Sequence, residues 1–308
     1  MFNVLCKLFK DLQPAELASV TIGRGAFGRV FSTSLDNNDF AIKICPTSPC
    51  SCRGERNSLS LRHPNIVKTH EIIELRPDDL SLFFTDSYLS NFNSVSLFKS
   101  IGLQMVIMEA AGSMSLETCI NDPNEVIDRE RRNYILYQIS AGLAYCHDQR
   151  ILHLDLKPSN IMISSDDTCK LVDFGCSLNL EPGHDHRGRI RCGGQPPPGT
   201  IPYTSPELFR GAKPTEKADI YSFGIIMWQL VSRETPFYGD SSQAIIFKVC
   251  RGVRPKFGES QASLEMSNYI RTAQCCWNAD TSIRPSADEL VHRFTSDSPD
   301  SGYESLTT

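Results

Sequence analysis

One short run of the chain, from His153 to Asn160, carries an acid, a cation and an amide at fixed offsets (His-Leu-Asp-Leu-Lys-Pro-Ser-Asn). The triplet Asp-Phe-Gly follows at 173–175. Phosphoryl transfer needs a carboxylate that accepts the proton of the attacking hydroxyl, and Asp155 can supply it. It also needs a positive charge, which Lys157 can provide, and oxygen ligands for Mg²⁺, which Asn160 and Asp173 can provide. The two runs together predict phosphoryl-transfer chemistry rather than a surface loop that is merely polar.

Composition bounds the class of protein that could carry this chemistry. The 308 residues suffice for one large domain or for two lobes sharing a cleft, and 40% apolar residues support a sizeable core. A net charge of −5 gives no footprint for nucleic acid. No apolar stretch reaches the ~18 residues of a membrane span, and residues 1–10 do not fit a signal peptide. We therefore expect a cytoplasmic protein with neither a nucleic-acid nor a membrane partner.

The 12 cysteines are scattered without a Cys-x-x-Cys pair. This spacing favours reduced thiols over structural disulfides or a zinc site. Cys176 differs only in following the Asp-Phe-Gly triplet directly. It could be a reactive thiol near a nucleotide, but we favour a structural role.

A glycine-rich run between two β-prone segments predicts a phosphate-binding hairpin. Its three glycines allow backbone amides to close over phosphates without Cβ clashes. The Gly-x-Gly-x-x-Gly pattern also fits a dinucleotide fold, but that site would want a helix directly after the glycines. Here the chain continues as a strand, with Val30 expected to cover the adenine of ATP. The residues expected at the phosphates are Ile22, Gly23, Arg24, Gly25, Ala26, Phe27 and Gly28.

The next predicted strand, Phe40–Ile44, sets one lysine, Lys43, among apolar neighbours. Its ammonium suits the α- and β-phosphates of ATP, and Ala41 belongs to the same expected site. Such a lysine needs a carboxylate partner on the following helix. We choose Glu55, and Glu71 is the poorer candidate because it lies in a predicted strand.

Two further strands and a linker are expected before the chain turns helical. The first follows a turn within 63–74, and the second covers 103–109; residues 76–100, polar and rich in Ser and Asn, form a long insertion between them. Residues 110–112 would link two lobes. This segment resembles the linker of protein kinases, whose backbone groups bind adenine, and the resemblance implies Met108, Glu109 and Ala111 at the adenine.

The remainder predicts a mostly helical unit. Helices are expected over 134–147 and, buried nearly all round, over 219–228. Residues 161–163 and 170–172 read as a short hairpin ending at Asp173, and 179–199 as a mobile segment without period. Asp219 is expected to cap its own helix and to orient the catalytic loop. The run Arg284-Pro285-Ser286 resembles that of a late arginine in protein kinases, and this resemblance implies an ion pair of Arg284 with Glu207.

Taken together, these motifs resemble the protein kinase signature. The resemblance implies an α+β bilobal fold, with a β-rich N-lobe and a mostly helical C-lobe. It also implies Thr200 beside Lys157 and Asp155, an arrangement typical of serine/threonine kinases. The domain limits that we expect are an extension over 1–17, a kinase domain over 18–295 (lobes 18–109 and 110–295) and a disordered tail over 296–308.

The resemblance is closer to one family. The runs His-Leu-Asp-Leu-Lys-Pro-x-Asn (153–160), Asp-Phe-Gly-Cys-Ser (173–177) and Lys-Ala-Asp-Ile-Tyr-Ser-Phe (217–223), with Ile-Met-Glu (107–109) and Cys-Trp (276–277), are similar to those of the Mos family. This likeness covers about residues 18–295. It implies a serine/threonine kinase of germ cells that phosphorylates a MAP-kinase kinase and drives the MAP-kinase cascade in meiotic maturation.

The chain departs from the general kinase pattern at several points. Leu154 stands where the signature has an arginine that grips an activation-loop phosphate. We therefore expect activity largely independent of loop phosphorylation, with control falling on protein abundance. The connection from Lys43 to Glu55 is short, so that the helix carrying Glu55 could be truncated at its start.

The tail offers a route to control of abundance. Residues 300–305 match Asp-Ser-Gly-x-x-Ser, a phosphodegron pattern read by a ubiquitin ligase. Phosphates on Ser301 and Ser305 would be strong acceptors for an arginine-rich pocket.

Three alternatives stay open at this stage. The first is an active serine/threonine kinase of another family, Raf-like or receptor-interacting. The second is a pseudokinase scaffold, which would be expected to lose Lys43, Asp155 or Asp173. The third, a non-kinase nucleotide-binding protein, would not need the run at 153–160.

Overall fold

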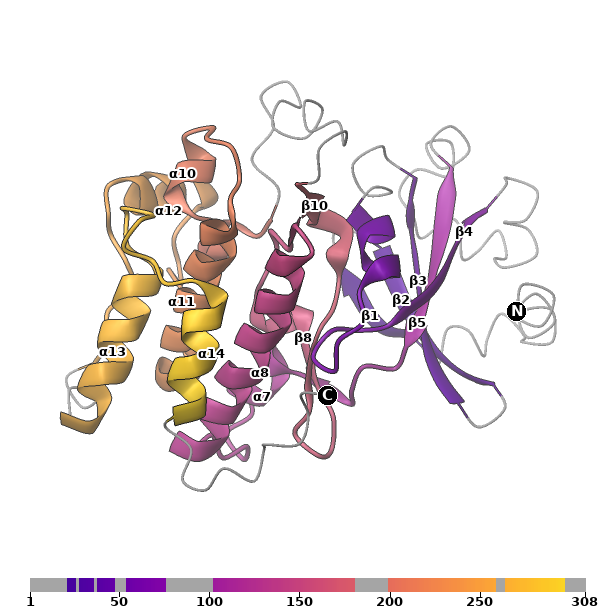
Figure 1. Ribbon diagram of the computed structural model, residues 1–308, viewed down its shortest axis with the longest axis horizontal. Coiled ribbons are helices and arrows are strands. Elements are labelled where there is room, and N and C mark those ends of the chain that lie inside the picture. Colours follow the sequence, from indigo (N-terminus) through magenta and orange to yellow (C-terminus); the bar gives the residue numbers. More distant parts are fainter. Residues whose placement is uncertain are drawn as a thin grey trace. The chain divides into compact units, whose positions relative to one another are not determined.

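The computed structural model describes residues 21–25, 28–35, 38–47, 54–75, 102–180, 199–258 and 264–296 (Figure 1). These residues form two compact units. The first contains the described residues up to Leu61 together with those from Val67 to Ala110, and the second contains Arg62–Ile66 and the described residues from Ala111 onward. The chain passes from one unit to the other after Leu61, after Ile66 and after Ala110, and the last passage falls within the predicted linker. The predicted domain limits stay predictions.

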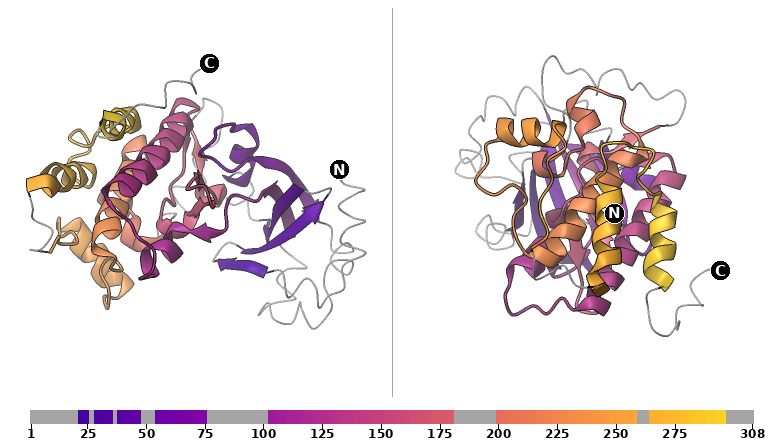
Figure 2. Two further views of the ribbon diagram at one scale, coloured as in Figure 1. Left: turned by 90° about the horizontal axis from the view of Figure 1, so that it is seen from below. Right: turned by 90° about the vertical axis from the view of Figure 1, so that its left-hand side faces the viewer.

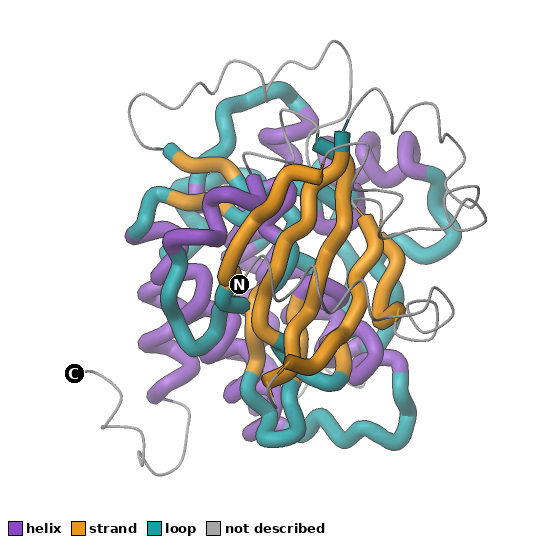
Figure 3. The backbone as a smooth tube through the Cα atoms, turned by 90° about the vertical axis from the view of Figure 1, so that its right-hand side faces the viewer, coloured by secondary structure: helices purple, strands orange, loops and turns teal. Residues whose placement is uncertain are grey.

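The first unit is built on a five-stranded sheet in the order β1-β2-β3-β5-β4, antiparallel throughout (Figure 3). The inner strands β3 and β5 carry the apolar runs that fill the core, with Ile42 and Ile107 fully buried. The predicted strands are confirmed. Their bounds are β1 (Thr21–Gly25), β2 (Gly28–Leu35), β3 (Asn38–Pro46), β4 (Thr69–Leu75) and β5 (Leu103–Glu109).

Residues 54–57 are helical and continue into the 3₁₀-helix η1 (Ser58–Ser60). The predicted truncation concerns residues before 54, which lie outside the described part of the chain. The predicted insertion over 76–100 also lies outside it.

The second unit is mostly helical, as predicted. Helix α8 packs against α14, and α11 packs against α13 (Figure 2). A Cβ on Gly224 of α11 would lie 2.8 Å from the Cβ of Cys276, so glycine lets these two helices approach closely. The helices are α7 (Leu116–Asn121), α8 (Arg129–Asp148), α10 (Pro206–Phe209), α11 (Glu216–Ser232), α12 (Ser242–Cys250), α13 (Leu264–Cys276) and α14 (Ala287–Ser296).

Two predictions for α8 and α11 are confirmed in their main feature. Ile135, Leu136, Ile139 and Leu143 of α8 are fully buried at helical spacing. Helix α11 buries residues all round from Ala218 to Leu230, which explains its apolar run.

Two small sheets and three 3₁₀-helices complete the described part of the second unit. The sheets have the orders β6-β8-β9 and β10-β7, and the predicted hairpin is the pair β8–β9. One predicted boundary was wrong. Asn179 was predicted to begin the irregular segment, but it belongs to strand β10 and pairs with Ile151 of β7. Residues 181–198 lie outside the described part. The bounds are β6 (Met114–Ser115), β7 (Ile151–Leu152), β8 (Ile161–Ile163), β9 (Cys169–Leu171), β10 (Leu178–Asn179), η2 (Pro158–Asn160), η3 (Phe174–Cys176) and η4 (Ile201–Tyr203).

Two further findings bear on the chain's class. None of the helices within the described ranges is long and apolar enough to cross a membrane. No disulfide joins the eight cysteines that the structure describes. Burial raises the pKa of the Cys169 thiol to about 12 and that of Cys146 well above its ordinary value, so that both are unreactive packing residues. Cys176 is also buried. Cys50 and Cys52 lie outside the described residues.

Candidate active site

Strand pairing brings four predicted nucleotide-site residues to one face of the sheet in the first unit. Val30 pairs directly with Lys43, and Ala41 pairs directly with Met108. Directly paired residues share a face, and so do residues two apart on one strand. Val30, Ala41, Lys43 and Met108 therefore line the same side.

Lys43 and Glu55 form an ion pair within this unit. The Nζ of Lys43 lies 2.5 Å from Oε1 of Glu55, and the two side chains are only 5% and 4% exposed. Glu71 lies in β4, which leaves Glu55 as the partner that the sequence predicted. A buried pair of this kind fixes the lysine in one place, where its ammonium can offer charge to an anion.

The glycine-rich run is described only at its two strands. Gly23 pairs with Val30, and Gly25 pairs with Gly28, so the run is a hairpin and not the strand-to-helix turn of a dinucleotide site. Ile22 and Arg24 lie on β1. Ala26 and Phe27 lie outside the described residues.

The end of β5 holds the last predicted nucleotide-site residues of this unit. Glu109 Oε1 accepts a hydrogen bond from the Lys68 amide at 2.8 Å, and the Glu109 amide donates to Lys68 O at 3.0 Å. The carboxylate is thus engaged with the backbone, and only the carbonyl of Glu109 could serve as an adenine contact. Ala111, the first residue of the second unit's main segment, is buried.

Asp155 is the centre of the polar cluster in the second unit. It is 3% exposed. Its Oδ1 accepts a hydrogen bond from the Thr200 hydroxyl at 2.7 Å, and its Oδ2 lies 3.0 Å from Nζ of Lys157. Lys157 Nζ also donates to the Thr200 hydroxyl at 2.7 Å. An acid, a cation and an aliphatic hydroxyl are thus in mutual contact, and the predicted position of Thr200 is confirmed.

The predicted metal ligands adjoin this cluster. The side-chain amide of Asn160 donates to Asp155 twice, to O at 2.9 Å and to Oδ2 at 3.1 Å, which turns its oxygen away from Asp155. The Val172 amide donates to Asn160 O at 3.0 Å and so brings the start of the Asp173 segment beside Asn160. Asp173 itself has φ 63°, a left-handed conformation of the kind that clusters at functional sites. An amide oxygen and a carboxylate are the oxygen ligands that Mg²⁺ prefers, so Asn160 and Asp173 fit a magnesium ion.

Asp219 holds the backbone of the catalytic loop, but not by capping its own helix. Its carboxylate accepts hydrogen bonds from the His153 amide at 2.9 Å and from the Leu154 amide at 2.8 Å. The cap position of α11 is Thr215, and Asp219 lies inside the first turn. The predicted orienting role is therefore confirmed and the predicted capping role is wrong, because the loop amides are the donors that the carboxylate satisfies.

Full burial by itself would favour the neutral form of Asp219 and raise the pKa of this carboxyl group. The hydrogen bonds from His147 and from the His153 amide outweigh this effect of burial, so that the pKa of Asp219 lies below its ordinary value. Asp219 is thus an ionised, buried anchor for the loop.

Two histidines that the sequence did not single out complete the scaffold. His147 Nε2 lies 3.0 Å from Asp219 Oδ2. His153 is fully buried, and its Nδ1 accepts the Asp155 amide at 3.3 Å, which leaves Nε2 to donate to Val172 O at 3.1 Å. His153 therefore ties the loop of Asp155 to the segment that ends in Asp173. Its signal in the sequence was its place at the head of the catalytic run.

The closing segment is anchored as predicted. Arg284 donates through Nη1 and Nη2 to the two carboxylate oxygens of Glu207, at 2.7 and 2.8 Å. Burial raises the pKa of Glu207, but hydrogen bonding and attraction to Arg284 hold it below its ordinary value.

Comparison with known proteins shows similarity to protein kinases, as the site residues predict. Residues 18–294 match the protein kinase domain family. The chain is 35% identical over 284 residues to the serine/threonine-protein kinase mos of Patiria pectinifera, a match that covers 88% of this chain and 72% of the relative. It is 31% identical to that of Xenopus laevis, covering 89% of this chain and 73% of the relative. It is 33% identical to the proto-oncogene serine/threonine-protein kinase mos of Mus musculus, covering 88% of this chain and 77% of the relative.

Proposed function

The chain belongs to the Mos family of serine/threonine protein kinases, and we propose that Asp155 is its catalytic base. In this proposal the hydroxyl of a substrate serine or threonine gives its proton to Asp155 while its oxygen bonds to the γ-phosphorus of ATP. The bond from that phosphorus to the β–γ bridging oxygen breaks, and ADP leaves with the bond's electron pair. Lys157 would offset the negative charge on the transferred group.

One observation carries this assignment. Asp155 Oδ1 already accepts the hydroxyl of Thr200 at 2.7 Å, and Lys157 donates to the same hydroxyl oxygen. The pair therefore binds an aliphatic alcohol in the manner that proton transfer requires. A substrate serine or threonine presents the same group.

We propose one set of residues for each part of the bound nucleotide. Protein kinase domains use ATP and a divalent metal ion; here we propose Mg²⁺, held by Asn160 and Asp173. The ion would neutralise charge on the phosphates. Lys43, fixed by Glu55, would hold the α- and β-phosphates. The glycine hairpin would cover them, and Val30, Ala41, Met108, the Glu109 carbonyl and Ala111 would contact adenine.

The substrate that we propose is the one that the Mos resemblance suggests. The Mos resemblance implies a MAP-kinase kinase as the phosphorylated protein, and hence a role as a MAP-kinase kinase kinase in oocyte meiotic maturation, in the cytoplasm. The relatives disfavour a Raf-like or receptor-interacting kinase. Lys43, Asp155 and Asp173, whose loss would mark a scaffold, are all present.

The test is phosphate transfer from Mg-ATP to a purified, catalytically dead MAP-kinase kinase. Asp155→Asn is the control, because it removes the proton acceptor and keeps the side-chain shape. We expect transfer to serine and threonine by the unaltered protein and none by the variant. Transfer to other proteins but not to the MAP-kinase kinase would overturn the substrate assignment. Equal transfer by both proteins would overturn the role of Asp155.

We also propose that abundance is controlled through the tail at Ser301 and Ser305, which lie outside the described residues. Phosphorylation of both would create the acceptor pattern that a ubiquitin ligase reads. Replacing both by alanine should lengthen the half-life of the protein in oocytes, measured after synthesis is blocked. An unchanged half-life would contradict the proposal.

A further inference from the structure

The hairpin β8–β9 carries the two proposed metal ligands at its open end. Asn160 immediately precedes β8, and Asp173 follows β9 after one intervening residue. The ladder is short, with the pairs Ile161↔Leu171, Met162↔Lys170 and Ile163↔Cys169. Because the hairpin is so short, contacts that fix its closed end also influence the position of the two ligands at its open end.

On the edge of β9 that faces away from β8, side-chain amides take hydrogen-bonding positions that a neighbouring strand would otherwise fill. The Cys169 amide donates to Gln138 Oε1 at 2.9 Å, and Cys169 O accepts Asn65 Nδ2 at 2.9 Å. The Leu171 amide donates to Asn65 O at 2.9 Å. Two side chains, of Gln138 and Asn65, and the backbone beside the bridge Ile66↔Leu171 thus satisfy the edge that an exposed strand leaves open.

Gln138 is the link between this edge and helix α8. Its Nε2 donates to Asp167 O at 2.9 Å, and its Oε1 accepts both the Cys169 amide and Asn65 Nδ2, the latter at 3.0 Å. The side chain is 3% exposed, so each of these contacts replaces water that cannot enter. Gln138 is therefore held in one rotamer and holds β9 in one position.

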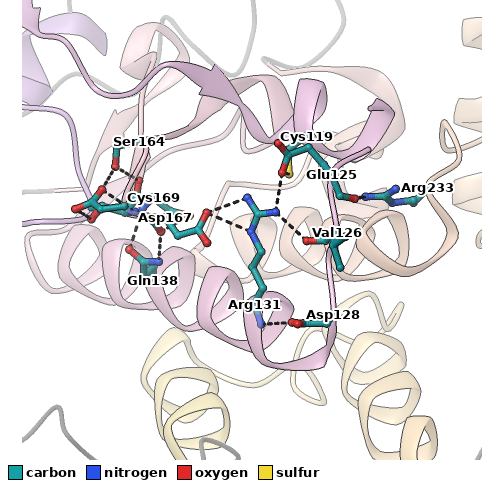
Figure 4. A network of polar contacts seen from close by, with 12 residues as sticks. Cys119, Glu125, Val126, Asp128, Arg131, Gln138, Ser164, Asp167, Cys169 and Arg233 are labelled. Atoms are coloured by element: carbon teal, nitrogen blue, oxygen red, sulfur yellow. Dashed lines mark hydrogen bonds and ion pairs between the residues drawn. The ribbon is translucent and has the colours of Figure 1, made fainter. Parts of the chain in front are cut away.

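A second contact between α8 and the hairpin lies two helical turns before Gln138. Arg131 donates to Asp167 Oδ1 through Nε at 3.2 Å and through Nη2 at 2.9 Å, and its Nη1 donates to Glu125 at 2.7 Å. Figure 4 shows its guanidinium between the two carboxylates, on the side of α8 from which Gln138 also projects. Asp167 occupies the turn in a left-handed conformation, φ 61°. The closed end of the hairpin is thus fixed to α8 at two points.

We propose that Gln138 is a positioning residue for Asp173, acting through the register of β9 on helix α8. The inference rests on the proposed function, in which Asp173 is a metal ligand. Asn160 is held directly by Asp155, and Asp173 follows β9 after Val172, so the position of β9 bears on where the backbone of Asp173 lies. Helix α8 also supplies His147 to Asp219, which holds the loop of Asp155. One helix therefore sets the proton acceptor and the metal ligand relative to each other.

The test measures metal binding rather than turnover. Mn²⁺ is titrated into the full chain with ADP present, and free Mn²⁺ is followed by electron paramagnetic resonance. Gln138→Met keeps the length of the side chain and removes all three hydrogen bonds. Gln138→Glu keeps the two acceptor contacts, and its second oxygen faces Asp167 O, to which it can donate only when the carboxyl group is protonated. Tyr269→Phe, which deletes a buried hydrogen bond to Met227 O, is the control for general destabilisation.

We expect the dissociation constant of Mn²⁺ to rise on the order of tenfold in Gln138→Met, as for other residues that orient metal ligands. It should rise less in Gln138→Glu and stay unchanged in Tyr269→Phe. Hydrogen exchange of the Cys169 and Leu171 amides, without metal, should accelerate in the same order. Wild-type Mn²⁺ affinity in Gln138→Met would overturn the proposal, and Gln138→Glu decides if the methionine variant does not fold. Failure of the unaltered protein to bind Mn²⁺ with ADP would instead overturn the proposed function.

Discussion

The carbonyl oxygen of Leu154 lies where a side chain on Gly199 would have to be. A Cβ built on Gly199 would come within 2.5 Å of that oxygen, and Gly199 has φ +108°. The neighbour of each residue is catalytic in our proposal or touches a catalytic group: Asp155 follows Leu154, and Thr200 follows Gly199. The contact of Thr200 with Asp155 thus depends on the glycine that precedes Thr200.

Gly199→Ala should therefore lower the turnover number strongly. The new methyl must push the Leu154 carbonyl away, and a displacement of about 1 Å at a catalytic group can cost on the order of 100-fold in rate. Gly211→Ala is the matched control, because Gly211 also has positive φ, +77°, but no atom within 4 Å of the added Cβ. Steady-state kinetics on both variants decide the matter. Equal losses in the two would show that backbone strain, and not the contact with Leu154, is responsible.

Activity should not depend on phosphorylation of the activation segment. Leu154 is 6% exposed, and its amide is bound to Asp219, so this position holds an apolar side chain where the kinase signature has a phosphate-binding arginine. Treatment of the purified kinase with a broad-specificity phosphatase should leave the turnover number unchanged. Complete loss of activity after treatment, reversed by rephosphorylation, would contradict this expectation.

The ion pair of Glu207 with Arg284 should stabilise the fold in neutral but not in acidic solution. The folded-state pKa of Glu207 is lowered, so its stabilisation is present above the unfolded value of about 4.3 and is lost as pH falls through the folded value. Arg284 is 1% exposed. Glu207→Gln should therefore cost about 3 kcal/mol of unfolding free energy at pH 7.

That difference should shrink as the pH falls below 4, since the wild-type carboxylate is then protonated while glutamine does not titrate. Urea unfolding of both proteins between pH 3 and 7 measures it. Glu130→Gln, at an exposed carboxylate, should show little difference at any pH. A gap between Glu207→Gln and wild type that stays constant down to pH 3 would show that packing, not charge, sets the cost.

The sequence predicted those parts of the site whose chemistry demands a residue type at a fixed offset. Asp155, Lys157 and Thr200 lie together as expected, and Lys43 found the predicted Glu55. Strands and helices with a clear apolar period were also predicted, because burial of one face, or of all faces in α11, leaves a visible pattern.

The parts that were not predicted are polar side chains that serve the backbone. Asp219 was placed as a cap because aspartate near a helix start commonly is one, yet it satisfies loop amides 65 and 66 residues away in the chain. Gln138 is a polar residue on a buried helix face, and the apolar periodicity that predicts such a face gives no role to a polar residue within it. Its partners lie on β9 and on the segment at Asn65, and no local pattern connects these three places.

Lys43 and Glu55 should prove energetically coupled in a double-mutant cycle. Lys43→Met removes the 2.5 Å ion pair from a carboxylate that is 3% exposed, and breaking a buried pair in this way costs about 3 kcal/mol. In the presence of Glu55→Gln the same lysine substitution should cost much less, since no buried charge then loses its counterion. Chemical unfolding of the four proteins gives the coupling energy.

The double variant should regain stability but transfer no phosphate, because the ammonium for the α- and β-phosphates is gone. Additive losses in stability would mean that the two groups do not act as a pair, and phosphate transfer by the double variant would contradict the proposed role of Lys43.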